Sequence, residues 1–163
     1  MIYDRGSNIN LIRGQVAETQ ELQMISNRAE RITVAGGGQV SAQFGSYKTQ
    51  LRLSNSGRKR ELICQGIQEI TGRVKKYPLQ EVHQEFRDAE LGLDTPLLEY
   101  TGGGQVSLLV GLQDISLDPV LIGILHSVLR VYQCPFFDVW GSSIAFAGPH
   151  PSFHNPGKME LCS

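Results

Sequence analysis

The chain begins with Met1-Ile2-Tyr3-Asp4-Arg5-Gly6-Ser7-Asn8, a short apolar run that leads into an Asp-x-Gly-Ser sequence. Asp, Gly and Ser favour turns, so this stretch predicts a short strand that ends in a turn and carries the carboxylate of Asp4 there. One interpretation of Asp4 is a turn residue that caps the segment after it, and the other is a functional carboxylate. The rest of the chain bears on that choice.

The composition is that of an ordinary globular domain. A chain of 163 residues is usually one domain, and it buries roughly 70% of its unfolded surface. The hydrophobic content of 40% is close to average usage. With 15 Lys and Arg against 16 Asp and Glu, the net charge of −1 gives no electrostatic case for binding nucleic acid or an acidic membrane surface. No segment is apolar for long enough to span a bilayer, and the N-terminus lacks the pattern of a signal peptide.

The cysteines and histidines argue against a disulfide framework and against a metal site. Cys64, Cys134 and Cys162 are odd in number, widely spaced and without a Cys-x-x-Cys motif, which favours reduced thiols and an intracellular, cytoplasmic location. His150 and His154 are four residues apart, but the proline between them breaks the helix that would align them on one metal ion. We therefore expect neither a metal nor another cofactor.

The hydrophobic pattern predicts a mainly β fold. Apolar and alternating stretches favour strands at residues 32–34, 40–44, 47–53, 61–67, 106–110, 129–137 and 142–147. They belong to one domain over residues 1–148. The stretch 149–163, which contains further prolines, is expected to form a C-terminal tail.

One or two short helices are expected beside the strands. Ser7 is placed to cap a helix at about residues 9–21, with Ile9, Ile12 and Val16 as an apolar stripe at helical spacing. Pro78 opens a second helix at residues 78–86, inside an insertion at about residues 73–100. Neither helix is long, so the β character of the fold is unchanged.

A glycine run, Gly36-Gly37-Gly38, follows the predicted strand at residues 32–34 and indicates a hairpin tip. A flexible tip without a function is one interpretation of it. Gly-Gly-Gly-Gln-Val occurs again at residues 102–106, but no second Asp-Ser/Thr-Gly motif exists. We therefore interpret the repeat as coincidence in a glycine-rich chain and not as an internal duplication.

Several stretches, taken in chain order, resemble the retropepsin-like aspartic protease domain of BEL/Pao-type retrotransposon polyproteins. The opening at residues 3–13, with its Asp-x-Gly-Ser turn, is one of them. The others are residues 32–38, 62–71, 106–111 followed by Asp118-Pro119, and 129–151, and together they cover nearly the whole chain. The resemblance implies a retropepsin-like fold of a single lobe.

The resemblance also implies a site. Asp4 would be the catalytic carboxylate, in a turn shaped by Arg5, Gly6 and Ser7. The flap over the substrate, at about residues 34–40, and the floor beneath it would include Val34, Gly36, Gly37, Gly38, Leu109, Val110 and Gly111. In the family, two aspartates from the two subunits of a homodimer share one proton, so that one activates water and the other hydrogen-bonds the scissile carbonyl. The implied partner is a peptide or polyprotein substrate, with no nucleic acid, no membrane and no cofactor.

Arg5 departs from the family, which carries Thr or Ser after the aspartate. Facing inward, its guanidinium would keep Asp4 ionised, and two such cations at a dimer axis would repel each other. A second departure is that only three residues precede Asp4, where the family carries a further strand. We therefore expect an aspartic endopeptidase-like domain that is inactive or impaired. The alternatives are a non-catalytic peptide-binding or dimerisation module derived from such a protease, and a fragment without a selected role.

Overall fold

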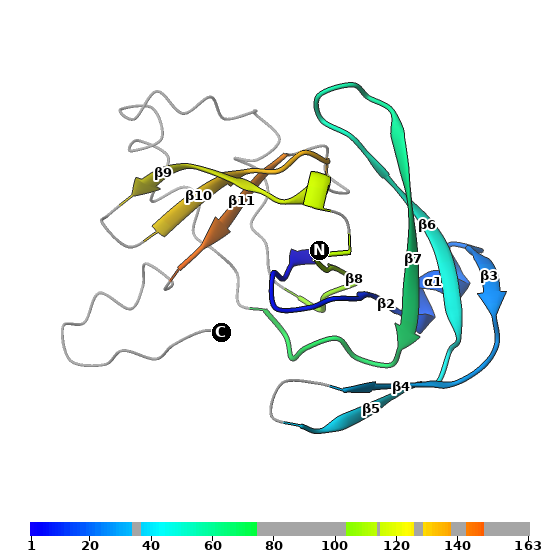
Figure 1. The fold of residues 1–163 in the computed structure, drawn as a ribbon. Helices are drawn as coiled ribbons and strands as arrows, with labels where there is room; N and C mark the ends of the chain where they lie inside the picture. Colours follow the sequence, from blue (N-terminus) through cyan, green and yellow to red (C-terminus); the bar gives the residue numbers. More distant parts are fainter. Residues whose placement is uncertain (34–36, 75–103, 114, 126–128, 138–142, 149–163) are drawn as a thin grey trace.

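The computed structural model describes residues 1–33, 37–74, 104–113, 115–125, 129–137 and 143–148. Their strands are β1 (Ile2–Tyr3), β2 (Asn10–Arg13), β3 (Gln23–Ser26), β4 (Glu30–Thr33), β5 (Gln39–Ala42), β6 (Ser46–Arg52), β7 (Lys59–Ile67), β8 (Leu108–Val110), β9 (Val120–Leu125), β10 (Leu129–Gln133) and β11 (Ile144–Ala147). A short helix, α1 (Gly14–Thr19), and a 3-10 turn, η1 (Ile115–Leu117), complete these elements. The described part of the chain is therefore mainly β, as the sequence predicts (Figure 1).

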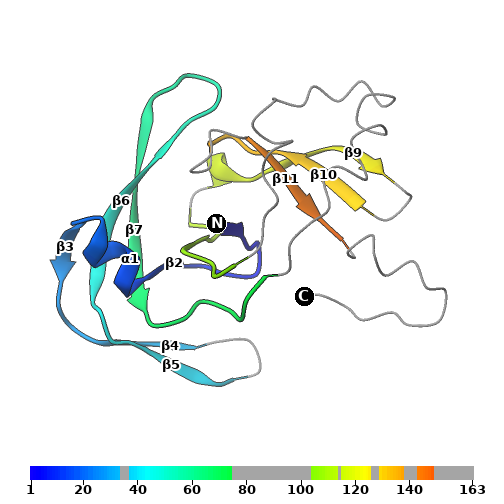
Figure 2. The same ribbon diagram turned by 180° about the vertical axis from the view of Figure 1, so that it is seen from behind.

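The strands form three sheets within the described residues. The largest is a mixed sheet of six strands in the order β1-β8-β2-β7-β6-β3. A second sheet has the order β11-β10-β9, and the hairpin β4-β5 forms the third. Figures 1 and 2, seen from front and back, show the N-terminal segment between the β6–β7 hairpin and the β11-β10-β9 sheet. The first residues of the chain thus sit where the two larger sheets meet.

Strand β2 corrects the prediction of a helix at residues 9–21. It pairs in parallel with β7 and antiparallel with β8, and Asn10, Leu11 and Ile12 are all buried. A strand enclosed in this way needs no alternation of apolar and polar residues, so its pattern over a few positions cannot be told from that of a buried helix. The helix α1 begins only at Gly14, and Arg13 at its N-cap makes no side-chain cap hydrogen bond.

The other strand predictions agree well with the described elements. β6 and β7 form a long antiparallel hairpin, and β10 pairs antiparallel with β11, which confirms the expected strands at residues 47–53 and 61–67 and the final strand pair. β10 ends earlier than predicted, at Gln133. β4, β5 and β8 lie within about two residues of the bounds expected for them, an error that is usual for strand ends.

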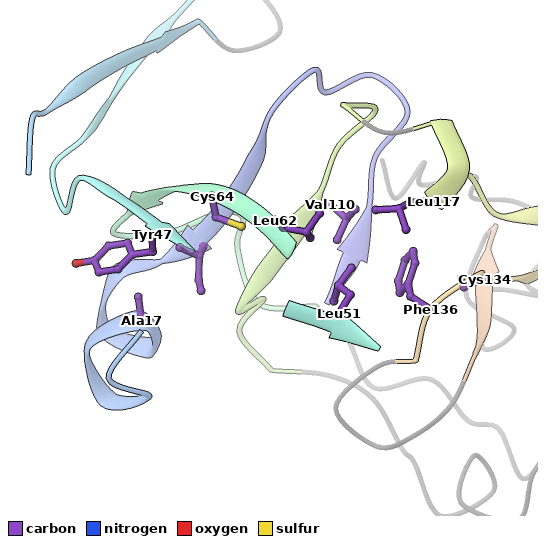
Figure 3. Packing of buried hydrophobic residues seen from close by; sticks show 10 residues of the cluster. Ala17, Tyr47, Leu51, Leu62, Cys64, Val110, Leu117, Cys134 and Phe136 are labelled. Carbon is purple, nitrogen blue, oxygen red and sulfur yellow. The ribbon is translucent and has the colours of Figure 1, made fainter. Parts of the chain in front are cut away.

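A hydrophobic core joins the large sheet to the β11-β10-β9 sheet (Figure 3). Leu51 and Leu62 come from the β6–β7 hairpin, Val110 from β8, Leu117 from η1, and Phe136 follows β10. Val110 and Leu117 are among the largest fully buried side chains. Val110 before η1 and Leu117 within it are both buried in this core, against which Tyr3 also packs. The core therefore holds the segment after β8 beside the N-terminus. By contrast, β9 exposes Val120, Leu121, Ile122 and Ile124.

Some predictions fall outside the described residues. They are Val34 and Gly36 of the flap, the helix at residues 78–86, nearly all of the insertion at 73–100, and the tail at 149–163. Gly37 and Gly38 of the same glycine run are described. None of the helices in the described part of the chain has the length and apolar character needed to cross a bilayer.

Candidate functional site

The Asp4 turn follows β1 directly. β1 pairs in parallel with β8, and the Asp4 amide continues this ladder by donating to the Val110 carbonyl at 3.0 Å. The chain then reverses, because the Ser7 amide donates to the Asp4 carbonyl at 3.2 Å. Within the turn, the Gly6 amide donates to Oδ1 of the Asp4 side chain at 2.8 Å. Asp4 and Gly6 are both exposed, so the carboxylate stands at the surface with one backbone donor directed at it.

Ser7 closes the turn locally and does not cap a helix. Its hydroxyl donates to the Ile9 carbonyl at 2.8 Å and accepts from the Ile9 amide at 3.3 Å. Both bonds lie within the three residues that separate the turn from β2. The residue therefore has the turn-shaping position that the sequence analysis gave it, through a Ser-type local turn.

Gly111 lies against this turn so closely that no side chain fits. A Cβ atom there would lie 2.3 Å from the Ile9 carbonyl oxygen and 2.7 Å from the Ser7 carbonyl oxygen. Both neighbours are backbone atoms, which cannot rotate away as a flexible side chain can. The next amide, that of Leu112, donates to the Ser7 carbonyl at 2.7 Å. The end of β8 and the Asp4 turn are thus packed backbone to backbone.

Asn10 is a buried polar residue at the same contact, and the sequence analysis missed it. Its Oδ1 accepts from the Gly111 amide at 2.9 Å. Its Nδ2 donates to the Ile63 carbonyl at 3.2 Å and to Oε1 of Gln113 at 3.0 Å. Asn10 is only 2% exposed, so these bonds replace the water that its amide would otherwise bind. The sequence did carry a signal for this buried polar residue, because Asn10 lies between Ile9 and Leu11 in an apolar stretch.

The Arg5 side chain does not take the inward orientation beside Asp4 that was considered above; it binds Asp118. Its Nε donates to Oδ1 of Asp118 at 2.8 Å and its Nη2 to Oδ2 at 3.2 Å, which is a bidentate ion pair. Nη2 also donates to the Pro119 carbonyl at 2.9 Å. The guanidinium carbon lies 5.9 Å from the centroid of the Tyr132 ring. Its charge is therefore directed at the loop before β9 and at β10.

Tyr3 binds the same carboxylate from the other side of Asp4. Its hydroxyl donates to Oδ1 of Asp118 at 3.1 Å, and its ring packs near that of Phe136 with the centroids 6.5 Å apart. Burial, and then the hydrogen bond to Asp118, raise the pKa of Tyr3 to about 12. The hydrogen bond and the charge of Asp118 likewise raise the pKa of Arg5. Tyr3 is therefore a neutral donor and Arg5 a cation at every pH at which such a domain works.

The residues expected in the floor are mostly core residues. Leu109 is 7% exposed and Val110 is fully buried, and each packs into a different hydrophobic cluster. The Val110 carbonyl and Gly111 contact the turn through their backbone atoms. The end of β8 therefore packs against the Asp4 turn, and its role as a floor stays a prediction.

The β4–β5 hairpin is the region expected to be the flap. Its strands pair from Glu30 opposite Ala42 to Thr33 opposite Gln39. Ile32, at 8% exposed, packs in the second cluster with Leu11, Ile67 and Leu109. Gly37, beyond the end of β4, has a φ of +80° and is exposed. One hydrophobic cluster therefore joins the hairpin to β2, which follows the Asp4 turn, and to β7 and β8.

The arrangement can supply one exposed carboxylate on a rigid backbone support. A single such carboxylate can accept or donate a proton, and a pair would be needed to hold one proton between two oxygens. In the part of the chain that the structure describes, no group of three or more His, Cys, Asp or Glu could hold a metal ion. Comparison of the chain with protein-family models, with curated proteins and with solved structures found no match.

Proposed function

We propose that this chain is an aspartic endopeptidase-like domain of the retropepsin type found in BEL/Pao retrotransposons, and that it acts on peptides or a polyprotein. The observation that supports this most is the Asp4 turn. Its carboxylate follows a strand, it is braced by an amide from its own turn, and Gly111 packs against the turn too closely for any side chain. Such support is what a carboxylate needs if it is to act as a general base or acid on a peptide bond.

The competent form is proposed to be a homodimer. One copy offers a single exposed aspartate in this turn, whereas water activation and polarisation of the scissile carbonyl require two carboxylates with one proton between them. A second copy related by a two-fold axis would supply the other Asp4. The thiols of Cys64 and Cys134 are buried, and buried structural thiols suit a cytoplasmic place of action.

We further propose that this copy is impaired by Arg5. In this family a Ser or Thr at that position donates hydrogen bonds that hold the two active-site loops together. Arg5 has no short hydroxyl, and its guanidinium is committed to Asp118 and Pro119 of its own chain. The contact between the loops of a dimer would therefore lack its usual donors, and we expect weak dimerisation and little turnover.

The test compares the wild-type chain with Arg5→Ser in a peptide-library cleavage assay at about pH 4–7, a range scanned because a coupled carboxyl pair makes the rate depend on pH. Light scattering measures the oligomeric state of the same samples. We expect Arg5→Ser to dimerise more strongly and to cleave peptides, with inhibition by a statine-type transition-state analogue. Arg28→Ser replaces an exposed arginine outside the turn and is the matched control.

Adding Asp4→Asn to Arg5→Ser must abolish that cleavage, because the amide cannot serve as the general base. Cleavage that persists in the double variant would come from a contaminant or another site. If Arg5→Ser neither dimerises nor cleaves any peptide, the endopeptidase proposal is wrong.

The second candidate is a non-catalytic peptide-binding module. It is favoured by the way Arg5 is bound within its own chain while the β4–β5 hairpin stays packed on the neighbouring strands through Ile32. Binding of extended peptides by the wild-type chain, without turnover in any variant, would identify it. Shortening the β4–β5 hairpin should then weaken peptide binding, and Asp4→Asn should leave it unchanged.

A further inference from the structure

Asp118 contacts both residues that flank Asp4. The Tyr3 hydroxyl and the Arg5 Nε donate to the same oxygen, Oδ1, at 3.1 Å and 2.8 Å, and the Arg5 Nη2 donates to Oδ2. Tyr3 is the last residue of β1 and Arg5 lies in the turn that follows, so this one carboxylate joins the end of the strand to the turn. The residue between them, Asp4, is thus held between two anchored neighbours.

The position of Asp118 is itself fixed by the core. It follows η1 and precedes β9, and its amide donates to the Ile115 carbonyl at 3.1 Å. Leu117 before it is 1% exposed and packs in the main cluster, and Pro119 after it is buried. The Asp118 side chain is 35% exposed, so its ion pair with Arg5 is partly shielded from solvent.

The turn needs such an anchor because β1 is short. Its two residues, Ile2 and Tyr3, pair only with β8, and the Asp4 amide extends that ladder by one bond. A two-residue strand frays readily, and an exposed turn beyond it would move with the fraying end. Tyr3, before Asp4 in the chain, adds one side-chain hydrogen bond to Asp118, and Arg5, after it, adds two.

We infer that Asp118 is a positioning residue for Asp4, fixing the turn from both sides through Tyr3 and Arg5. The inference rests on the proposed function only for its consequence, since orientation of Asp4 affects turnover only if Asp4 is the catalytic group. In the wild-type chain Arg5 fixes the turn from within its own subunit; in Arg5→Ser, hydrogen bonds of the serine across the dimer would take over that support. Arg5 lacks the hydroxyl that the family places between the two subunits. Through Asp118 it binds the turn to the segment between η1 and β9 of its own subunit.

The test reads the geometry of the turn without requiring turnover. The Gly6 amide donates to Oδ1 of Asp4 at 2.8 Å, so its NMR proton shift should follow the ionisation of that carboxylate. Asp4→Asn must remove this pH-dependent shift, which assigns it. Asp118→Asn keeps one acceptor oxygen, but it removes the charge and places an NH2 donor against the Arg5 Nη2, which breaks the bidentate pair. We expect the shift to fall to about half of its wild-type size or less, because hydrogen bonds weaken steeply as their angle departs from linear.

Two further variants make the result specific. Tyr3→Phe removes one of the three bonds and should give a smaller loss of the Gly6 shift; it also carries the test if Asp118→Asn does not fold. Glu61→Gln breaks a different surface ion pair, between Glu61 and Lys48 at 3.0 Å, and should leave the Gly6 shift unchanged.

A folded Asp118→Asn or Tyr3→Phe chain with the full wild-type Gly6 shift would overturn the inference. A loss of the shift in Glu61→Gln equal to that in Asp118→Asn would also overturn it, since the effect would then be a general loss of stability. The cleavage assay of Arg5→Ser is separate. If that assay fails while the Gly6 shift responds as expected, the endopeptidase proposal falls and the positioning role of Asp118 stands.

Discussion

The Asp4 turn follows the edge strand β1 of the six-stranded sheet, whereas the β4–β5 hairpin is a sheet of its own, and the two regions are held in different ways. The turn is packed backbone to backbone against Gly111, whose amide donates to the Asn10 side chain, and Asp118 binds the turn through Arg5. The hairpin pairs with itself, and Ile32 is its buried side chain in the cluster with β2 and β8. A rigid support for a carboxylate and a cover that can open would require this contrast.

This difference between the two regions predicts how substitutions in each will change the free energy of unfolding. Changes in the turn should lower the stability of the whole domain, because its contacts are shared with the central strands β2 and β8. Changes in the hairpin should mainly affect the hairpin, because local segments with few buried contacts can open without unfolding the rest. The expected effects therefore decrease from the Gly111 contact, through Asn10, to the tip of the hairpin.

Gly111→Ala should have the largest effect. The new Cβ would meet the carbonyl oxygens of Ile9 and Ser7 at 2.3 Å and 2.7 Å, so β8 or the turn must move. We expect the free energy of unfolding to fall by about 3 kcal/mol, the upper part of the range for overpacking. Chemical denaturation followed by circular dichroism measures it.

Gly72→Ala is the control, because a Cβ at Gly72 meets nothing within 4 Å and its φ is not in the left-handed region. It should leave the stability close to that of the wild type. If Gly111→Ala is as stable as Gly72→Ala, the close packing of turn and strand is not present in solution.

Asn10→Ala should have the next largest effect. It leaves the buried Gly111 amide without its acceptor and removes both bonds donated by Nδ2. An unsatisfied buried group costs about 1–3 kcal/mol, and we expect a loss near the middle of that range. Asn8→Ala, an exposed asparagine two residues earlier, is the matched control and should change little. Equal stabilities of the two variants would mean that the buried amide contributes nothing net.

The strands that could be predicted from sequence are those whose pattern is local. Leu51 and Leu53 alternate with polar residues, and the turn at residues 55–57 marks where β6 ends and β7 begins. The helix prediction failed at β2 for the opposite reason. Ile9 and Ile12 have helical spacing, and only pairing with β7 and β8, far along the chain, makes the segment a strand.

The residues of the candidate site likewise fall into those that a local motif predicts and those that depend on contacts far along the chain. Asp4, Gly6 and Ser7 lie together in one short turn, so their sequence motif could be read directly. Asn10 acts on an amide 101 positions away, and Arg5 on a carboxylate 113 positions away. No local pattern specifies such contacts. The direction of the Arg5 side chain, for which the sequence argument considered only an inward orientation, could therefore come only from the folded structure.

Gly37→Ala should have the smallest effect, and its comparison with Gly57→Ala tests the contrast between the two regions most directly. Both glycines have left-handed φ, +80° and +65°, and a Cβ on either would meet nothing within 4 Å. An alanine forced into this region costs about 1–2 kcal/mol wherever it occurs. Gly57 lies at the tip of the β6–β7 hairpin, which carries the main core, so Gly57→Ala should lower the stability of the whole domain by about that amount.

At Gly37 the same strain can be released by opening the β4–β5 tip alone, so the global stability should fall by only a few tenths of a kcal/mol. Hydrogen exchange of the β4–β5 amides should accelerate in Gly37→Ala, with the β6–β7 amides unchanged. Equal losses of global stability in Gly37→Ala and Gly57→Ala would mean that the hairpin unfolds only with the core. The hairpin could not then serve as a cover that opens by itself, and the idea of a flap would lose its physical basis.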